Sequence, residues 1–192
     1  MGSGTSNDFN NQVLPPDTWA SRATLAHARS LLGKVLVRTR EGRETAHVIT
    51  EVEAYIGERD LACHASAGRT PRTAVMFGPP SHWYVYLVYG MHEMLNLVTG
   101  PEDWPSAILI RGVAGVSGPG RVTRALAVDR GLNGKPVARS SGLHIEDRGI
   151  RVPDLAVVRT PRIGVDYAGA IWSAKPWRFV VEPAALGVAV TD

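Results

Sequence analysis

Two polar residues lie together in a segment whose pattern predicts a β-strand. Residues 45–55 alternate between apolar and polar types, so Glu53 and Tyr55, two positions apart, share one face of the expected strand. A carboxylate there could act as a general base, and a phenol beside it could hold a ligand. Glu51 lies on the same face and is the competing carboxylate. Taken alone, the pair is explained at least as well by a solvated strand face.

Tyrosines are concentrated near this pair. The chain has five, and four of them lie in or beside two predicted strands: Tyr55, Tyr84, Tyr86 and Tyr89. Tyr84 and Tyr86 share one face of a strand, where stacked core aromatics are the simpler explanation. Tyr89 stands next to Gly90 at a predicted hairpin turn. Because a hairpin tip is normally wet, a core role for Tyr89 is harder to defend than a projecting one.

Other polar residues are open to two interpretations. Asn96 interrupts an apolar strand, so its amide either satisfies backbone groups or contacts a ligand. His64 follows the single cysteine, and adjacent residues rarely ligate one metal; no other histidine lies at ligand spacing, so we expect no metal site. Arg69 and Arg72 lie in the irregular segment 57–80 and could donate to phosphates or be surface charges.

These residues require a set of short elements to position them. A helix is expected after Pro15-Pro16, capped by Asp17 and ended by Gly33, and a second helix from Gly118-Pro119 to Val128. Strands are expected at 34–39, 45–55, 82–89, 92–99, 106–111, 144–145, 162–165 and 178–181. Within 45–55 we expect Val48 and Val52 on one face and Ile49 on the other with Glu51, Glu53 and Tyr55. Strands without regular βαβ alternation predict an α+β fold with a largely antiparallel sheet.

Composition fixes the class of protein. The chain has 192 residues, of which 44% are hydrophobic and 20% charged, which is typical of one globular domain. We expect residues 1–13 to form a flexible leader without signal-peptide features and 14–192 to form the domain. The net charge of +3 permits a polyanionic partner without requiring one. No apolar run approaches the roughly 20 residues that span a bilayer, so we expect no membrane span.

The cysteine content narrows the compartment and the chemistry. With Cys63 alone, no intramolecular disulfide can form, and zinc fingers and zinc deaminases are excluded. A reducing, cytoplasmic location is therefore expected.

A series of short strings resembles the alkyladenine (3-methyladenine) DNA glycosylase family. With His64 and Asn96, the strings are EAY at 53–55, GRTPR at 68–72, MF at 76–77, WYVYLVYGM at 83–91, LIR at 109–111, SGP at 117–119, ALA at 125–127, RIGV at 162–165, AG at 168–169, KP at 175–176 and RF at 178–179. They occur in order over roughly residues 30 to 182. Trp83, His92 and Pro79-Pro80 depart from the family pattern near the hairpin.

The resemblance implies a role for each matching residue. Glu53 would activate the attacking water, which Arg111 and the backbone carbonyl of Ile163 would help to hold. The walls of the base pocket would be Tyr55, His64 and Tyr86, with His64 donating a hydrogen bond, and Asn96 would crowd the exocyclic amino group of guanine. Tyr89 would fill the gap left in the duplex, and the remaining DNA-binding residues would be Met91, Arg69, Thr70 and Arg72.

The resemblance also implies a complete activity. The chain would be a monomeric, monofunctional DNA glycosylase that flips out alkylated, and also deaminated, purines from duplex DNA and hydrolyses them off in base excision repair, without lyase activity, metal or cofactor. If bacterial, it would associate with the nucleoid. The implied fold is a single domain whose curved, mostly antiparallel sheet has flanking helices and a protruding β-hairpin.

Elementary chemistry supports this activity. A stacked base is unreachable and must be flipped out, and an inserted aromatic can fill its place. Tyrosine faces attract a cationic alkylated base, and one carboxylate with one water then suffices for hydrolysis.

Two other functions compete with this activity. One is a non-catalytic module that binds damaged or distorted nucleic acid on the same scaffold. The other is a hydrolase of free nucleosides, which would have little use for Tyr89 or the loop arginines.

Overall fold

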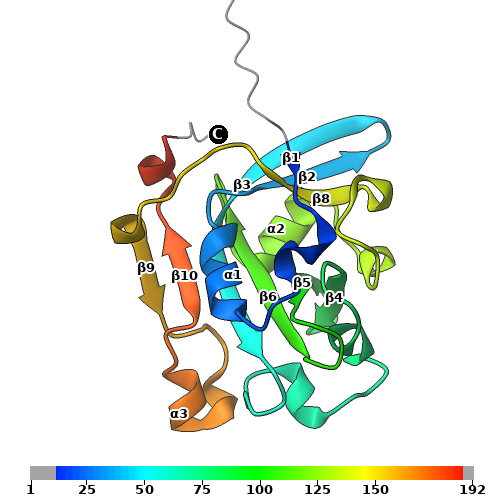
Figure 1. Ribbon diagram of the computed structural model, residues 1–192, viewed down its shortest axis with the longest axis vertical. Helices are drawn as coiled ribbons and strands as arrows, with labels where there is room; N and C mark the ends of the chain where they lie inside the picture. Colours follow the sequence, from blue (N-terminus) through cyan, green and yellow to red (C-terminus); the bar gives the residue numbers. More distant parts are fainter. Residues whose placement is uncertain (1–11, 188–192) are drawn as a thin grey trace, which may run out of the picture.

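The sheet is organised around one long strand, β3 (Arg43–Ile56). In this computed structural model, which describes residues 12–187, β3 pairs along its first half with β2 (Val35–Arg40) and along its second half with β6 (Ser106–Val113), while β10 (Arg178–Val181) also pairs with its second half (Figure 1). The central position of β3 explains how one strand can carry residues of both the core and a site.

The remaining strands extend this sheet in both directions. The order is β1-β8-β2-β3-β6-β5-β4, with β10 against β3, β9 against β10 and β7 against β6, and the pairings between these strands are all antiparallel. The other strands are β1 (Gln12–Val13), β4 (Trp83–Val88), β5 (His92–Thr99), β7 (Val116–Ser117), β8 (Leu143–Asp147) and β9 (Val157–Thr160). The predicted α+β class, with a single domain and a mostly antiparallel sheet, is confirmed.

Within residues 12–187, three short α-helices and several 3-10 helices complete the fold. α1 (Thr24–Leu31) packs against β3 and β6, and α2 (Pro119–Ala125) packs against β5, β6 and β7, whereas α3 (Gly169–Ser173) follows the loop after β9 (Figure 1). The 3-10 helices are η1 (Pro16–Trp19), η2 (His64–Ala67), η3 (Ala74–Phe77), η4 (Arg130–Leu132), η5 (Arg139–Ser141), η6 (Asp154–Ala156), η7 (Asp166–Ala168) and η8 (Pro183–Leu186).

The main core lies between the sheet and a set of helices that includes α1, α2 and η1, whereas α3 contributes no buried residue to it. Trp19 and Trp83 are its largest buried side chains, and the indole N–H of Trp83 donates to the carbonyl of Leu143 at 3.0 Å. Trp83, one of the departures from the family pattern, therefore serves the core.

A bulge in β3 changes the predicted alternation. The alternation predicts Ile49 and Val52 on different faces of the strand. Both lie instead in the main core cluster, whereas Val48 packs in a separate cluster. The pairing register of β3 with β6 shifts on either side of Glu51. Because a bulge inserts an extra residue and reverses the phase of the alternation, the expected faces hold only after residue 51.

The N-terminal helix predicted up to Gly33 is wrong in its extent. The segment contains η1 and the separate helix α1, and Ala23 between them has a non-helical backbone. Asp17 lies inside η1 and caps no helix. The second predicted helix is shorter than expected, because α2 ends at Ala125 and Ala127 has a positive φ of 46°.

Two further expectations concern the predicted strand at 162–165 and the predicted leader. The strand predicted at 162–165 is wrong: these residues form a loop, and the strand that pairs with β10 is β9, which begins five residues earlier. The predicted leader lies outside the described residues except for Gln12 and Val13, which pair with β8 as β1.

Candidate active site

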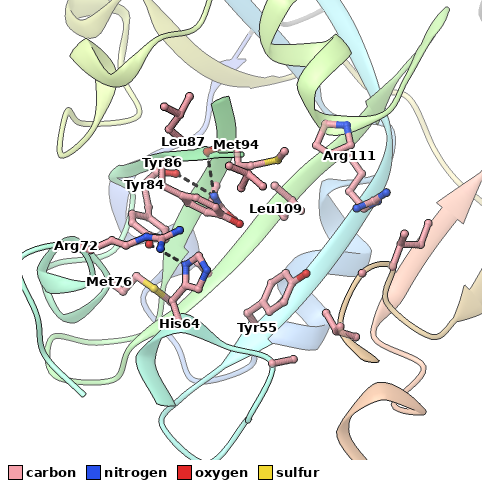
Figure 2. A pocket seen from close by; sticks show the side chains of 18 of the residues that line it. Tyr55, His64, Arg72, Met76, Tyr84, Tyr86, Leu87, Met94, Leu109 and Arg111 are labelled. Carbon is pink, nitrogen blue, oxygen red and sulfur yellow. Dashed lines mark hydrogen bonds between the residues drawn. The ribbon is translucent and has the colours of Figure 1, made fainter. Parts of the chain in front are cut away.

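A cavity of about 550 Å³ opens between the sheet and two loops. Its walls come from β3, β4, β5 and β6, from the loop that carries η2 and η3, and from the loop after β9 (Figure 2). The predicted site residues among its lining are Tyr55, His64, Arg72, Tyr86, Tyr89, Asn96, Arg111 and Ile163. The fold thus brings together positions that span more than half of the sequence.

Glu53 is fully buried and lies directly behind the part of the cavity wall that Tyr55, Arg111 and Ile163 form. The Tyr55 hydroxyl donates to its Oε2 at 2.8 Å, and the backbone N–H of Ile163 donates to its Oε1 at 2.7 Å. Arg111 approaches from the third side, with its Nη1 3.4 Å from Oε2 and its Nε 3.4 Å from Oε1. All three partners also line the cavity, so the carboxylate is one side chain away from any ligand bound there.

Burial is the main influence on the charge of Glu53. Removal from water raises the pKa of this carboxyl, and the Arg111 charge, the Ile163 N–H and the Tyr55 hydroxyl offset only part of the rise, while the nearby Glu51 adds to it. A carboxylate with a raised pKa is a stronger base than an ordinary glutamate. Glu53 therefore has the properties of a general base.

Arg111 is shared between two carboxylates. Its Nε donates to Oε1 of Glu51 at 2.9 Å, closer than either of its contacts with Glu53. Arg178, on the neighbouring strand β10, donates to the same Glu51 oxygen at 2.6 Å. Both guanidinium groups make their short contacts with Glu51, and Glu51 thereby anchors Arg111 beside Glu53.

The Tyr55 side of the pocket rests on a buried ion pair. Arg162 donates to both carboxylate oxygens of Asp60, at 2.6 and 2.8 Å, and to the carbonyl of Ala54 at 2.9 Å. Its guanidinium lies 4.8 Å from the centre of the Tyr55 ring. This pair ties the loop that carries Ile163 to β3 and so positions two of the three partners of Glu53.

The opposite side is an aromatic cluster around His64. The ring of His64 meets Tyr86 edge-on, with 4.5 Å between ring centres, and its Nδ1 lies 2.9 Å from the Tyr84 hydroxyl (Figure 2). Burial, with a smaller contribution from the charge of Arg72, lowers the pKa of His64 to about 4. His64 is therefore neutral at physiological pH and offers one N–H donor.

Asn96 has a fixed orientation at the pocket wall. Its amide nitrogen donates to two backbone carbonyls, those of Tyr84 at 3.0 Å and Met94 at 3.2 Å. Because both amide hydrogens are used, the side-chain oxygen is the atom left to meet a ligand. The structure confirms that the Asn96 amide satisfies backbone groups, and the contact with a ligand stays a prediction.

The hairpin of β4 and β5 ends in two exposed side chains. Tyr89 is 88% exposed with a positive φ of 53°, and Gly90 follows with a φ of 72°. The turn closes through the Met91 N–H, which donates to Val88, and Met91 itself is 70% exposed. The prediction that Tyr89 projects from the tip is confirmed. His92, a departure from the family pattern, lies at the base of the tip.

The three candidate DNA-binding residues of the loop have different surroundings. Arg69 is ion-paired with Asp103 and stacks on Phe77. The backbone N–H of Thr70 donates to the side-chain hydroxyl of Thr73 at 2.8 Å. Arg72 instead reaches the pocket, where its guanidinium lies 4.9 Å from the centre of the Tyr86 ring.

Several residues of the site were missed by the sequence analysis. Arg162 was quoted only within a matching string, and Asp60 carried no signal at all. Tyr167, which lines the cavity and donates to the carbonyl of Ala62 at 3.0 Å, was also missed. No local pattern could reveal such contacts, because each joins segments about a hundred residues apart.

Two findings bear on other expectations. Within residues 12–187, no group of three or more histidine, cysteine, aspartate or glutamate side chains is arranged to hold a metal ion. No helix in this part of the chain is long and apolar enough to cross a membrane.

Comparison with known proteins gives one consistent answer. The family model for methylpurine-DNA glycosylase matches residues 18–117 and 114–185. A relative from Methanocella arvoryzae is 46% identical over 87% of this chain and 91% of its own length, and one from Anaeromyxobacter dehalogenans is 48% identical over 86% and 81%. A third, from Myxococcus xanthus, is 46% identical over 86% and 89%. All three are provisionally named 3-methyladenine DNA glycosylases.

Proposed function

The chain belongs to the methylpurine-DNA glycosylase family, and from that premise we propose that it flips a damaged purine out of duplex DNA and hydrolyses its N-glycosidic bond, leaving an abasic site. The proposed substrates are alkylated purines and deaminated ones such as hypoxanthine. The proposed setting is base excision repair on chromosomal DNA in the cytoplasm, by a single copy of the chain.

One observation carries the proposal: Glu53 is buried with a raised pKa, and each of its partners also faces the cavity. No residue that lines this cavity, within the described chain, carries a carboxylate, and Glu53 lies just behind three residues that do line it. A lone base beside a pocket with aromatic walls fits a reaction in which water is activated and the leaving group is a flat base.

The long contacts of Arg111 suggest where the water would bind. Charge-assisted hydrogen bonds are usually 2.7–2.9 Å, whereas Arg111 stays 3.4 Å from both oxygens of Glu53. A water on the cavity side of this pair would meet both a donor, Arg111, and an acceptor, the carboxylate. The role implied for the Ile163 carbonyl stays a prediction, since the contact to Glu53 comes from the Ile163 N–H.

The proposed step balances as a simple hydrolysis. The water oxygen forms a bond to C1′ of the sugar and gives a proton to Glu53, while the bond from C1′ to the base breaks and its electron pair leaves with the base. A base alkylated at N3 or N7 is a cation and leaves as a neutral molecule. A neutral base leaves with negative charge unless it is protonated or hydrogen-bonded.

The pocket offers no amine for a lyase reaction. The chain has only three lysines, Lys34, Lys135 and Lys175, and none lines the cavity. A lyase forms an imine between such an amine and the sugar. We therefore propose a monofunctional enzyme, for which borohydride should trap no protein on a lesion-containing duplex.

Excision from oligonucleotides tests the proposed function. Duplexes that each carry one 3-methyladenine, 7-methylguanine, hypoxanthine or ethenoadenine are incubated with the protein, and released base and abasic sites are measured. Base release from at least one duplex is expected. Binding without release would favour the non-catalytic module, and release from free nucleosides but not from duplexes would favour a nucleoside hydrolase.

A further inference from the structure

Arg72 is a positive charge at the pocket wall without a balancing partner. Its guanidinium lies 4.9 Å from the centre of the Tyr86 ring and lines the cavity (Figure 2). Arg69, three residues earlier, is paired with Asp103, whereas no carboxylate in residues 12–187 forms an ion pair with Arg72. Arg72 is exposed to solvent, so it brings a partly screened but unpaired positive charge to the edge of the place where the base would lie.

Tyr55 and Tyr86 each have an arginine against the ring, but only one of these arginines is paired with a carboxylate. Tyr55 also has a guanidinium against its ring, that of Arg162 at 4.8 Å, but the charge of Arg162 is balanced by Asp60 at 2.6 Å. The attraction of an aromatic face for cations is one reason why such a pocket suits a cationic base. At Tyr86 an unbalanced cation already uses that attraction.

We propose that Arg72 is a specificity-determining residue, which disfavours cationic alkylated purines and favours neutral damaged purines such as hypoxanthine. The inference rests on the proposed function, because it names the preferred charge of the base in that same pocket. It gives Arg72 a different role from the phosphate contact that the sequence resemblance implied.

The effect follows from the charges in the hydrolysis. A cationic base enters the pocket against the repulsion of Arg72 and keeps part of its charge in the transition state. A neutral base acquires negative charge as its bond to the sugar breaks, and Arg72 stabilises that charge. The developing positive charge on the sugar is common to both substrates, so it cancels in a comparison between them.

A hydrogen-bond chain through Tyr84 adds to the preference. The Tyr84 hydroxyl lies 2.9 Å from His64 Nδ1, and the nearby charge of Arg72 acts on this phenol. A positive charge favours the orientation in which the Tyr84 oxygen faces the guanidinium and the hydroxyl hydrogen points to His64. Neutral His64 then carries its proton on Nε2, as a donor for an acceptor atom on a neutral base.

The test compares two lesions in matched variants. kcat/KM is measured for duplexes with one hypoxanthine or one 7-methylguanine, using the unmodified protein, Arg72→Gln, Arg72→Lys and Arg69→Gln. We expect Arg72→Gln to raise the ratio of 7-methylguanine to hypoxanthine excision by roughly tenfold, the scale of one charge acting across a partly solvated pocket. Arg72→Lys, which keeps the charge, should stay near the original ratio.

Each alternative role predicts a different result. If Arg72 binds a phosphate, Arg72→Gln lowers excision of both lesions equally and reduces the salt dependence of binding, which leaves the ratio unchanged and overturns the inference. Arg69→Gln should give that pattern or no effect. Thermal melting of each variant checks folding, and a fall in the ratio after Arg72→Gln also contradicts the proposal.

The proposed function and this inference fail in different ways. If the unmodified protein releases no base from any lesion duplex, the proposed function is wrong. If it releases base and the ratio does not depend on residue 72, only the specificity role is wrong.

Discussion

Two glutamates of the same sheet are almost equally buried, yet their charges are controlled in opposite ways. Glu53 on β3 is fully buried and Glu146 on β8 is 1% exposed. The pKa of Glu53 is raised because burial outweighs its partners. Burial also acts to raise the pKa of Glu146, but hydrogen bonds from His144 and Arg148 outweigh it and hold that pKa below its ordinary value.

The difference comes both from the partners and from depth, because Glu146 lies close to the surface beneath its arginines and loses less hydration than Glu53. Glu146 accepts from His144 and Arg148 at 2.9 Å and from Arg139 at 2.5 Å, and the two arginines extend toward the solvent. The arginine beside Glu53 keeps 3.4 Å away and is shared with Glu51. A carboxylate with short ion pairs stabilises the fold, whereas one whose nearest cation stays farther away keeps the basicity that chemistry requires.

The largest expected effect separates the two carboxylates by activity. Glu53→Gln should lower the rate of base excision by on the order of 10² to 10⁴, because it removes the proposed general base, while lesion binding is retained. Glu146→Gln is the matched control and should excise at the original rate. Glu51→Gln is the check on assignment: an active Glu53→Gln with an inactive Glu51→Gln would place the base on Glu51.

A substitution at the hairpin tip should change DNA binding without changing either glutamate. Tyr89 is exposed and contacts neither glutamate, so Tyr89→Ala should leave the melting temperature nearly unchanged. If its ring fills the vacated stack, its loss should weaken lesion-selective binding by about 1–3 kcal/mol, or roughly ten- to hundredfold. Titration with lesion and undamaged duplexes measures this, and unchanged selectivity would remove the wedge role.

Local patterns were sufficient to predict some of these features. The period-two alternation after residue 51 places Glu53 and Tyr55 together, and the apolar strands around Gly90 predict the hairpin with Tyr89 at its tip. Both depend on neighbours in the sequence, for which residue type and spacing carry the information.

Long-range interactions set the features that the sequence did not reveal. Ile49 changes face because of a bulge, and Asp60 acquires its role only by meeting Arg162, 102 residues away. Glu146 lies just beyond the predicted strand 144–145, and its partner Arg139 belongs to a different element. Such pairs depend on how the segments fold together, so one sequence does not contain a local signal for them.

Stability measurements should show the two glutamates as opposites. A raised folded-state pKa means that ionised Glu53 destabilises the fold at neutral pH, so Glu53→Gln should raise the melting temperature there, and the gain should vanish as acid protonates the native residue. Glu146, with its lowered pKa, stabilises the fold at neutral pH. Glu146→Gln should cost on the order of 1 kcal/mol there, and progressively less as the pH falls through the folded-state pKa.

These opposite trends can be checked in one set of experiments. Melting curves of the two variants and of the unmodified protein are recorded across the acidic and neutral range. If both variants are destabilised in parallel at every pH, the charge of Glu53 is balanced as well as that of Glu146, and the comparison fails.

The smallest expected effect is a displacement of the pH profile, which tests how Arg111 controls Glu53. Excision needs ionised Glu53, so kcat/KM should rise with pH through the pKa of this residue, which lies above that of an ordinary glutamate. The positive charge of Arg111 holds that pKa down, so Arg111→Gln should move the acidic limb to higher pH. The variant also removes a cation from Glu51, whose negative charge then raises the pKa of Glu53 further. Arg148→Gln, which removes the corresponding partner of Glu146, should leave the limb in place. Because Arg111 is also proposed to hold the water, the rate itself will fall, and the normalised profile is therefore the informative quantity. A limb that stays fixed or moves to lower pH in Arg111→Gln would mean that another group, and not Glu53, is titrating.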